Sequence, residues 1–211
     1  MRKDLYIFSG LGADERVFYK LDVSEYNTTY ITWVPANKDE EIEQYASRII
    51  NQITSPKPIL LGLSFGGIIA TEVAKQIETE KVILVSSAKT KNEIPWYYRL
   101  LGKLRVHKLL PEYVLKRASF FTYWLFGVNS LQDKQLLRQI LKDTDTNFLQ
   151  WAIDNIVRWK NQTLLTNVLH IHGKQDRILP LTFVHTDIVI ENGGHLMIIT
   201  HADTINQLLS R

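Results

Sequence analysis

A serine, an aspartate and a histidine occur in that order along this chain, each shortly after an apolar run. Ser64 lies within the segment GLSFGG, residues 62–67, whereas Asp176 and His195 follow two later apolar runs. A serine hydroxyl is a weak nucleophile, and it gains reactivity from a neighbouring imidazole that a carboxylate orients. These residue types therefore predict nucleophilic catalysis, provided that the fold brings the three side chains together.

The glycines around Ser64 indicate a sharp turn from a strand into a helix. Such a turn strains the backbone of its central residue, and neighbouring side chains would collide there, so glycine is needed two residues before and after it. Gly62 and Gly66 occupy these positions, and Gly67 leaves room for close helix packing. The turn lifts the Ser64 hydroxyl above the sheet edge, at the start of a helix. An alternative interpretation is an ordinary glycine-rich turn that holds a phosphate, but the flanking strand and helix favour a nucleophile.

Strand-like and helix-like segments alternate along the chain, which is typical of a parallel sheet covered by helices. The alternation stops between about residues 90 and 160, where several helical stretches and no convincing strand occur. We therefore expect an α/β fold with a mostly parallel sheet of about six strands, helices on both faces and a helical insertion. The predicted strands are 5–8, 28–34, 59–63, 81–85, 168–171 and 187–190, and the predicted helices outside the insertion are 39–53, 64–77 and 202–209.

Asp176 and His195 both follow strands of this predicted sheet, and parallel sheets bind ligands at the carboxyl ends of their strands. Each residue has an ordinary alternative, as a turn residue for Asp176 and as a helix cap for His195. Both residues follow Ser64 in the sequence and are expected at the same carboxyl edge of the sheet, which favours a catalytic triad. His170 and His172 alternate along one strand, but no third metal ligand is evident, and we expect no metal site. We assign surface or structural roles to His107, His185 and His201.

The composition is that of an ordinary globular protein, with 45% hydrophobic and 22% charged residues and no cysteine. The apolar run 5–8 is too short for a signal peptide, and no stretch approaches the ~20 apolar residues that span a bilayer. We therefore expect a cytoplasmic protein without membrane association. Residues 89–127 hold eight basic and two acidic side chains, which indicates a separate module rather than a nucleic-acid-binding protein. The predicted core comprises residues 1–88 and 162–211, and the insertion comprises residues 89–161.

At this point the chain resembles the α/β-hydrolase fold superfamily over nearly its whole length. The resemblance is carried by Gly62-Leu63-Ser64-Phe65-Gly66, by His172-Gly173 through Asp176 and Pro180, and by Gly193-Gly194-His195. It implies that Ser64 is the nucleophile, that His195 is the general base and then the acid, and that Asp176 orients the imidazole. Some members place the acid after the strand that here ends at Val85, but that position reads Ser86-Ser87-Ala88. We expect the sheet to begin at the superfamily's third strand, without the usual N-terminal hairpin, and the resemblance implies no cofactor.

The resemblance also implies an oxyanion hole made of two backbone amides. The amide after the nucleophile belongs to Phe65, and the second donor lies in the loop after the first strand, where Leu11 matches. This loop often reads His-Gly in the superfamily, but here it reads Ser9-Gly10-Leu11-Gly12, so Gly12 is an alternative donor. We also predict substrate contacts at Gly10 and Gly12.

An insertion at this point of the superfamily's fold is a cap over the active site. Nine of the chain's 22 aromatic residues fall within residues 96–126. One interpretation is a pocket for an apolar acyl or alcohol group, lined by residues such as Trp96, Phe121 and Trp124, with basic residues that attract an acidic substrate. In the other, the aromatic residues attach the cap to the core while the basic residues face solvent.

These observations predict a serine hydrolase that acts on a carboxylic ester or thioester of a small molecule through an acyl-enzyme. A lyase or an acyltransferase with the same triad is one alternative, and a weakly catalytic ligand sensor is another, because the fold alone does not fix the reaction. Nothing in the sequence specifies an oligomeric state.

Overall fold

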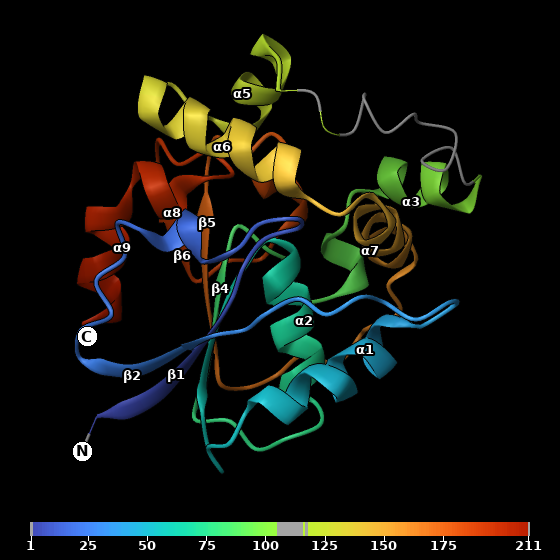
Figure 1. Cartoon of the computed structure of the whole chain (residues 1–211), viewed down its shortest axis with the longest axis vertical. Coiled ribbons are helices and arrows are strands. Elements are labelled where there is room, and N and C mark those ends of the chain that lie inside the picture. The colour runs from blue at the N-terminus through green and yellow to red at the C-terminus, as the bar shows by residue number, and fades with distance from the viewer. Residues whose placement is uncertain (1, 105–115, 117, 211) are drawn as a thin grey trace.

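The structure is a computed structural model that describes residues 2–104, 116 and 118–210. Its centre is a sheet of six parallel strands in the order β2-β1-β3-β4-β5-β6 (Figure 1), which confirms the predicted α/β fold. The strands are β1 Lys3–Phe8, β2 Tyr26–Tyr30, β3 Ile59–Leu63, β4 Lys81–Val85, β5 Val168–Gly173 and β6 Ile188–Ile190. The α-helices are α1 Ile42–Ile49, α2 Phe65–Ala74, α3 Trp96–Lys103, α5 Phe120–Phe126, α6 Leu131–Asp143, α7 Thr146–Arg158, α8 Met197–Thr200 and α9 Ala202–Leu209.

Successive side chains of the strands enter two hydrophobic cores, one on each face of the sheet. Leu5 and Ile7 of β1 contribute to the core that contains the buried residues of α8 and α9. Tyr6 and Phe8 contribute to the other core, under α1 and α2. Because successive side chains of a strand point to opposite faces, a continuous apolar run is what a sheet buried on both faces requires.

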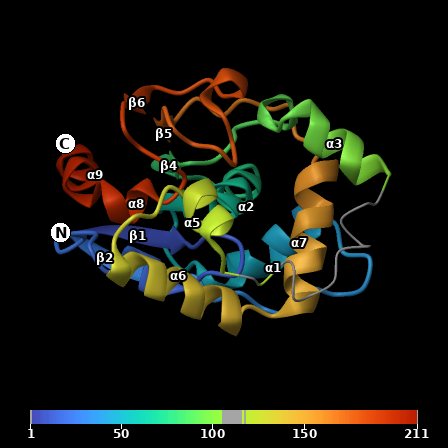
Figure 2. The same ribbon diagram turned by 90° about the horizontal axis from the view of Figure 1, so that it is seen from above.

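The segment between β4 and β5 supplies α3, α5, α6 and α7, which lie beyond the carboxyl ends of the strands (Figures 1 and 2). Indole N–H groups tie α7 to the core, with Trp151 donating to Glu40 O at 2.8 Å and Trp159 donating to Glu72 Oε1 at 2.7 Å. None of the helices in the described ranges is long and apolar enough to cross a membrane. Six residues that enter the predictions, by name or in the counts of basic, acidic and aromatic residues, lie outside the described residues, namely Arg105, His107, Lys108, Glu112, Tyr113 and Arg117.

The predicted second strand, 28–34, was too long at its carboxyl end. β2 ends at Tyr30, and Trp33 turns away from the sheet to contact the rings of Phe65 and Phe148 at centroid distances of 5.6 and 5.8 Å. The backbone of Val34 bonds instead to the Tyr45 hydroxyl. Aromatic and β-branched residues favour strands only where the sheet continues, and here tertiary packing overrides that preference.

Candidate active site

The turn between β3 and α2 holds Ser64 in a conformation that the flanking glycines make possible. Ser64 has φ 52° and ψ −119°, a region that residues other than glycine rarely adopt. A Cβ on Gly62 would lie 2.4 Å from Gly67 Cα, and a Cβ on Gly66 would lie 2.3 Å from Phe8 O. Both glycines are therefore needed where the helix approaches the strands, as the sequence predicted.

The three side chains singled out in the sequence meet at the carboxyl edge of the sheet. His195 Nε2 lies 2.8 Å from Ser64 Oγ, and His195 Nδ1 lies 2.7 Å from Asp176 Oδ2. Asp176 Oδ1 accepts hydrogen bonds from the amides of Ile178 and Leu179 at 2.9 and 2.8 Å. Since Asp176 Oδ2 accepts from His195 Nδ1–H, the Nε2 lone pair of a neutral His195 faces the serine hydroxyl.

Asp176 is buried, yet its surroundings favour the charged carboxylate. Burial by itself would raise the pKa of Asp176, but the neighbouring His195, the Leu179 amide and His172 together lower it below the ordinary value. An ionised Asp176 can hold the His195 ring in one orientation and stabilise it when it takes up a proton.

The loop after β1 lies beside this row of side chains. Within the described residues, neither the Leu11 amide nor the Phe65 amide donates a hydrogen bond to another group of the chain. Gly12 has φ 68°, and Gly10 is buried against Leu63. The Leu11 and Phe65 amides therefore stay predicted oxyanion donors, and Gly12 stays the alternative to Leu11.

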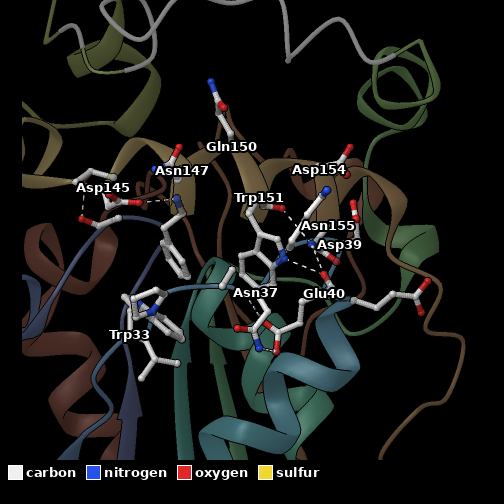
Figure 3. A pocket seen from close by; sticks show the side chains of 18 of the residues that line it. Trp33, Asn37, Asp39, Glu40, Asp145, Asn147, Gln150, Trp151, Asp154 and Asn155 are labelled. Atoms are coloured by element: carbon white, nitrogen blue, oxygen red, sulfur yellow. Dashed lines mark hydrogen bonds between the residues drawn. The ribbon is translucent and has the colours of Figure 1, made fainter.

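A groove of about 940 Å³ starts at Gly12 and Ala13 and runs between the segment 33–41 and helix α7 (Figure 3). Trp33, Phe148 and Trp151 form its aromatic part, and amide and carboxylate side chains, including Asn37, Asp39, Asp145, Asn147 and Gln150, surround them. Most of its charged groups are already paired; Glu40 with Arg48 and Asp143 with Arg16 are two such pairs. This groove was not predicted from the sequence, in which Trp33 and Val34 were expected to continue a strand.

The aromatic residues predicted to line a substrate pocket, Trp96, Phe121 and Trp124, lie outside this groove. Their side chains are strongly exposed, at 65%, 64% and 46%. Phe126 is the aromatic residue of α5 that reaches the site, because its ring lies edge-on to His195 at 5.7 Å and its carbonyl accepts from Leu196 N–H at 3.1 Å. Its place at the end of a helix-like aromatic run did not distinguish it in the sequence.

A sequence model described as "Alpha/beta hydrolase family" matches residues 8–208, nearly the whole chain. The chain belongs to the alpha/beta hydrolase family. The matched range includes the sheet and the described helices between β4 and β5.

Solved structures with the same fold are distant in sequence. A hydrolase from Oleispira antarctica has TM-score 0.74 at 14% identity, covering 100% of this chain and 90% of its own. An esterase from Exiguobacterium antarcticum has TM-score 0.70 at 20% identity, covering 99% and 90%. An epoxide hydrolase from Bacillus megaterium has TM-score 0.68 at 12% identity, covering 100% and 93%. No curated protein matches the sequence significantly. At these identities the structures establish the fold alone, and the alpha/beta hydrolase family includes several reactions.

Proposed function

We propose that this alpha/beta hydrolase cleaves a carboxylic ester or thioester through an acyl-enzyme on Ser64. The observation that carries the proposal is the unbroken row Ser64–His195–Asp176, with contacts of 2.8 and 2.7 Å. A serine, a neutral imidazole and a carboxylate in this order are sufficient for nucleophilic acyl transfer.

In the first half of the reaction, Ser64 Oγ attacks the carbonyl carbon while His195 Nε2 takes the hydroxyl proton. The carbonyl oxygen becomes an oxyanion, which the Leu11 and Phe65 amides stabilise. The bond to the leaving oxygen or sulfur then breaks, and His195 gives that atom the proton. In the second half, His195 deprotonates a water whose oxygen attacks the acyl carbon, and Ser64 leaves with the proton.

The groove supports a substrate with one sizeable, partly apolar group. Its lining includes Gly12 of the proposed oxyanion loop, the indole rings of Trp33 and Trp151 and several amide side chains, but not Ser64, Asp176 or His195. Its volume exceeds what an acetyl group fills, and ligand sites of this kind combine apolar walls with a few orienting polar groups. The acyl or alcohol part of the ester would occupy it, beside helix α7 of the proposed cap.

A fluorophosphonate, which reacts with activated serines, tests the proposal directly. We expect the intact mass of the wild type to increase by one adduct, no adduct on Ser64→Ala, and much slower labelling of His195→Ala. Ser86→Ala is the matched control and should label like the wild type. Labelling followed by turnover in a series of esters and thioesters would support the proposal. An unlabelled wild type, or labelled protein that hydrolyses neither class, would contradict it.

A further inference from the structure

Two histidines of β5 are buried directly beside the carboxylate of Asp176. His170 and His172 both have no exposed surface. His172 Nε2 lies 3.5 Å from Asp176 Oδ2, the same oxygen that His195 Nδ1 approaches to 2.7 Å. Within the described residues, no group of three or more histidine, cysteine or acidic side chains could hold a metal ion, so another role for the pair has to be considered.

His172 is bonded to the turn that carries Asp176. Its Nε2 lies 2.8 Å from Leu179 O, and a carbonyl oxygen can only accept, so Nε2 carries the proton. The amide of the same Leu179 donates to Asp176 Oδ1 at 2.8 Å. Leu179 is thus held from both sides, by the ring of His172 at its carbonyl and by the Asp176 carboxylate at its amide.

Two protons, one on each ring, are enough for the histidine pair to donate to the carbonyls of Leu179 and His185. His170 Nδ1 lies 3.2 Å from His185 O and must donate to it, so the single proton of a neutral His170 is used there. The remaining nitrogens, His170 Nε2 and His172 Nδ1, face each other at 3.4 Å as two lone pairs. Only a third proton would bond the rings to each other, and it would create a buried cation next to Asp176.

The surroundings oppose that third proton. Burial lowers the pKa of His170 to about 3 and also lowers the pKa of His172. The charged groups that act on the pair are Asp176 and Glu93, which favour a proton, and Lys89 and a protonated His195, which disfavour it. When His170 and His172 are both neutral, His195 is the one histidine of the three that can form an ion pair with the Asp176 carboxylate.

We propose that His172 is a positioning residue for the active site: its neutral imidazole fixes the turn 176–179 through Leu179 O, and thereby holds Asp176 against His195. The expected effect of His172 on turnover rests on the proposed function, whereas its effect on the position of the turn 176–179 does not.

Two amide substitutions at the same position separate this role from simple packing. In His172→Gln the side-chain amide reaches the position of Nε2 and can still donate to Leu179 O, whereas in His172→Asn it reaches only the position of Nδ1. His170→Asn is the matched control, because its amide can still donate to His185 O from an equally buried site of the same strand.

We expect His172→Asn to lower kcat for an ester, and the rate of fluorophosphonate labelling, by about 10- to 100-fold with little change in KM, as a misplaced catalytic group does. His172→Gln and His170→Asn should stay within about threefold of the wild type, by the same reasoning.

Hydrogen exchange of the Ile178 and Leu179 amides tests the positioning without any chemistry. Both amides bond to Asp176 Oδ1, so exchange should accelerate in His172→Asn and stay slow in His172→Gln and His170→Asn. Equal rates in all three variants, or a His172→Gln as impaired as His172→Asn, would overturn the inference. If the wild type neither labels nor hydrolyses esters, the proposed function fails, and the exchange pattern alone decides the role of His172.

Discussion

Two neighbouring strands of the sheet are each followed by a serine with a positive φ, Ser64 after β3 at 52° and Ser86 after β4 at 50°. Each amide donates to the adjacent strand, Ser64 to Val85 O at 2.9 Å and Ser86 to Ile171 O at 3.1 Å. Ser64 Oγ meets His195, whereas the buried Ser86 Oγ has no hydrogen-bond partner among the described residues. A strained serine at this edge is therefore not distinctive by itself, and what separates the two is the imidazole that faces only one of them.

Removing each serine hydroxyl in turn tests the difference between Ser64 and Ser86 most directly. We expect Ser64→Ala to lower ester turnover by about 10⁴-fold or more, because loss of the nucleophile leaves only binding and oxyanion stabilisation. Ser86→Ala should stay within about threefold of the wild type in the same assay, since its hydroxyl contacts no group of the proposed machinery. Comparable losses in both variants would show that the strained turn, rather than the contact with His195, determines reactivity.

The carboxylate that orients the imidazole gives the next largest effect. Asp176→Asn should lower kcat by about 10³- to 10⁴-fold with the protein still folded. The Asn oxygen can accept from the Ile178 and Leu179 amides, which turns its NH₂ group towards His195 Nδ1 and imposes the wrong tautomer. Steady-state kinetics would measure the loss of kcat, and circular dichroism would check that the variant is folded. A loss below tenfold would count against a catalytic triad of Ser64, His195 and Asp176.

The two turns also differ in the residues two positions away from each serine. Gly62 and Gly66 flank Ser64, whereas Leu84 and Ala88 flank Ser86, because only the first turn enters a helix at once. A Cβ at Gly66 would lie 2.3 Å from Phe8 O, so Gly66→Ala should destabilise the fold by more than about 3 kcal/mol.

Gly10→Ala is the control for stability, because the nearest atom to its added Cβ lies 3.8 Å away, an ordinary contact. It should change the free energy of unfolding by less than about 1 kcal/mol. Urea unfolding of both variants measures the difference, and a well-folded Gly66→Ala would show that the approach of α2 to the strands can relax.

The end of β5 adds a pH dependence that neither serine turn has. Folding lowers the pKa of His170 to about 3 and lowers that of His172, so below the ordinary histidine value of 6.5 the unfolded chain binds more protons. The free energy of unfolding should therefore fall as the pH decreases from about 6.5 towards 3, by roughly 1.4 kcal/mol per pH unit for each excess proton. Urea titrations at several pH values would show a flatter slope in His170→Asn if the buried ring is the cause.

The smallest effect concerns the serine without a partner. A buried hydroxyl that makes no hydrogen bond costs about 1–3 kcal/mol, so Ser86→Ala should raise the free energy of unfolding, by about 1 kcal/mol after the lost contacts are subtracted. A decrease in stability would mean that a bound water satisfies Ser86 Oγ in solution.

The order of strands and helices, and the meeting of Ser64, Asp176 and His195, could be predicted because each follows from local patterns and from the geometry of a parallel sheet. The environment of Trp33 could not be predicted, because an aromatic residue just beyond a strand has the sequence pattern of a continued strand. The start of α1 at Ile42 rather than Asp39 was also hidden, because Asp39 adopts φ 58°. The role of His172 depends on which carbonyl its ring meets, and that is a property of the folded turn rather than of the spacing.

The contact between Thr144 and Gly12 joins the insertion to the loop of the proposed oxyanion hole. Thr144 Oγ1 lies 2.9 Å from Gly12 O, and a Cβ on Gly12 would come within 2.4 Å of the threonine methyl group. Thr144 is buried at the corner between α6 and α7, so this corner cannot lift from the sheet without pulling on Gly12. The loop proposed to stabilise the negative charge of the reaction is thus tied to the corner between α6 and α7, and a displacement of this corner would shift the backbone of Gly12 with it.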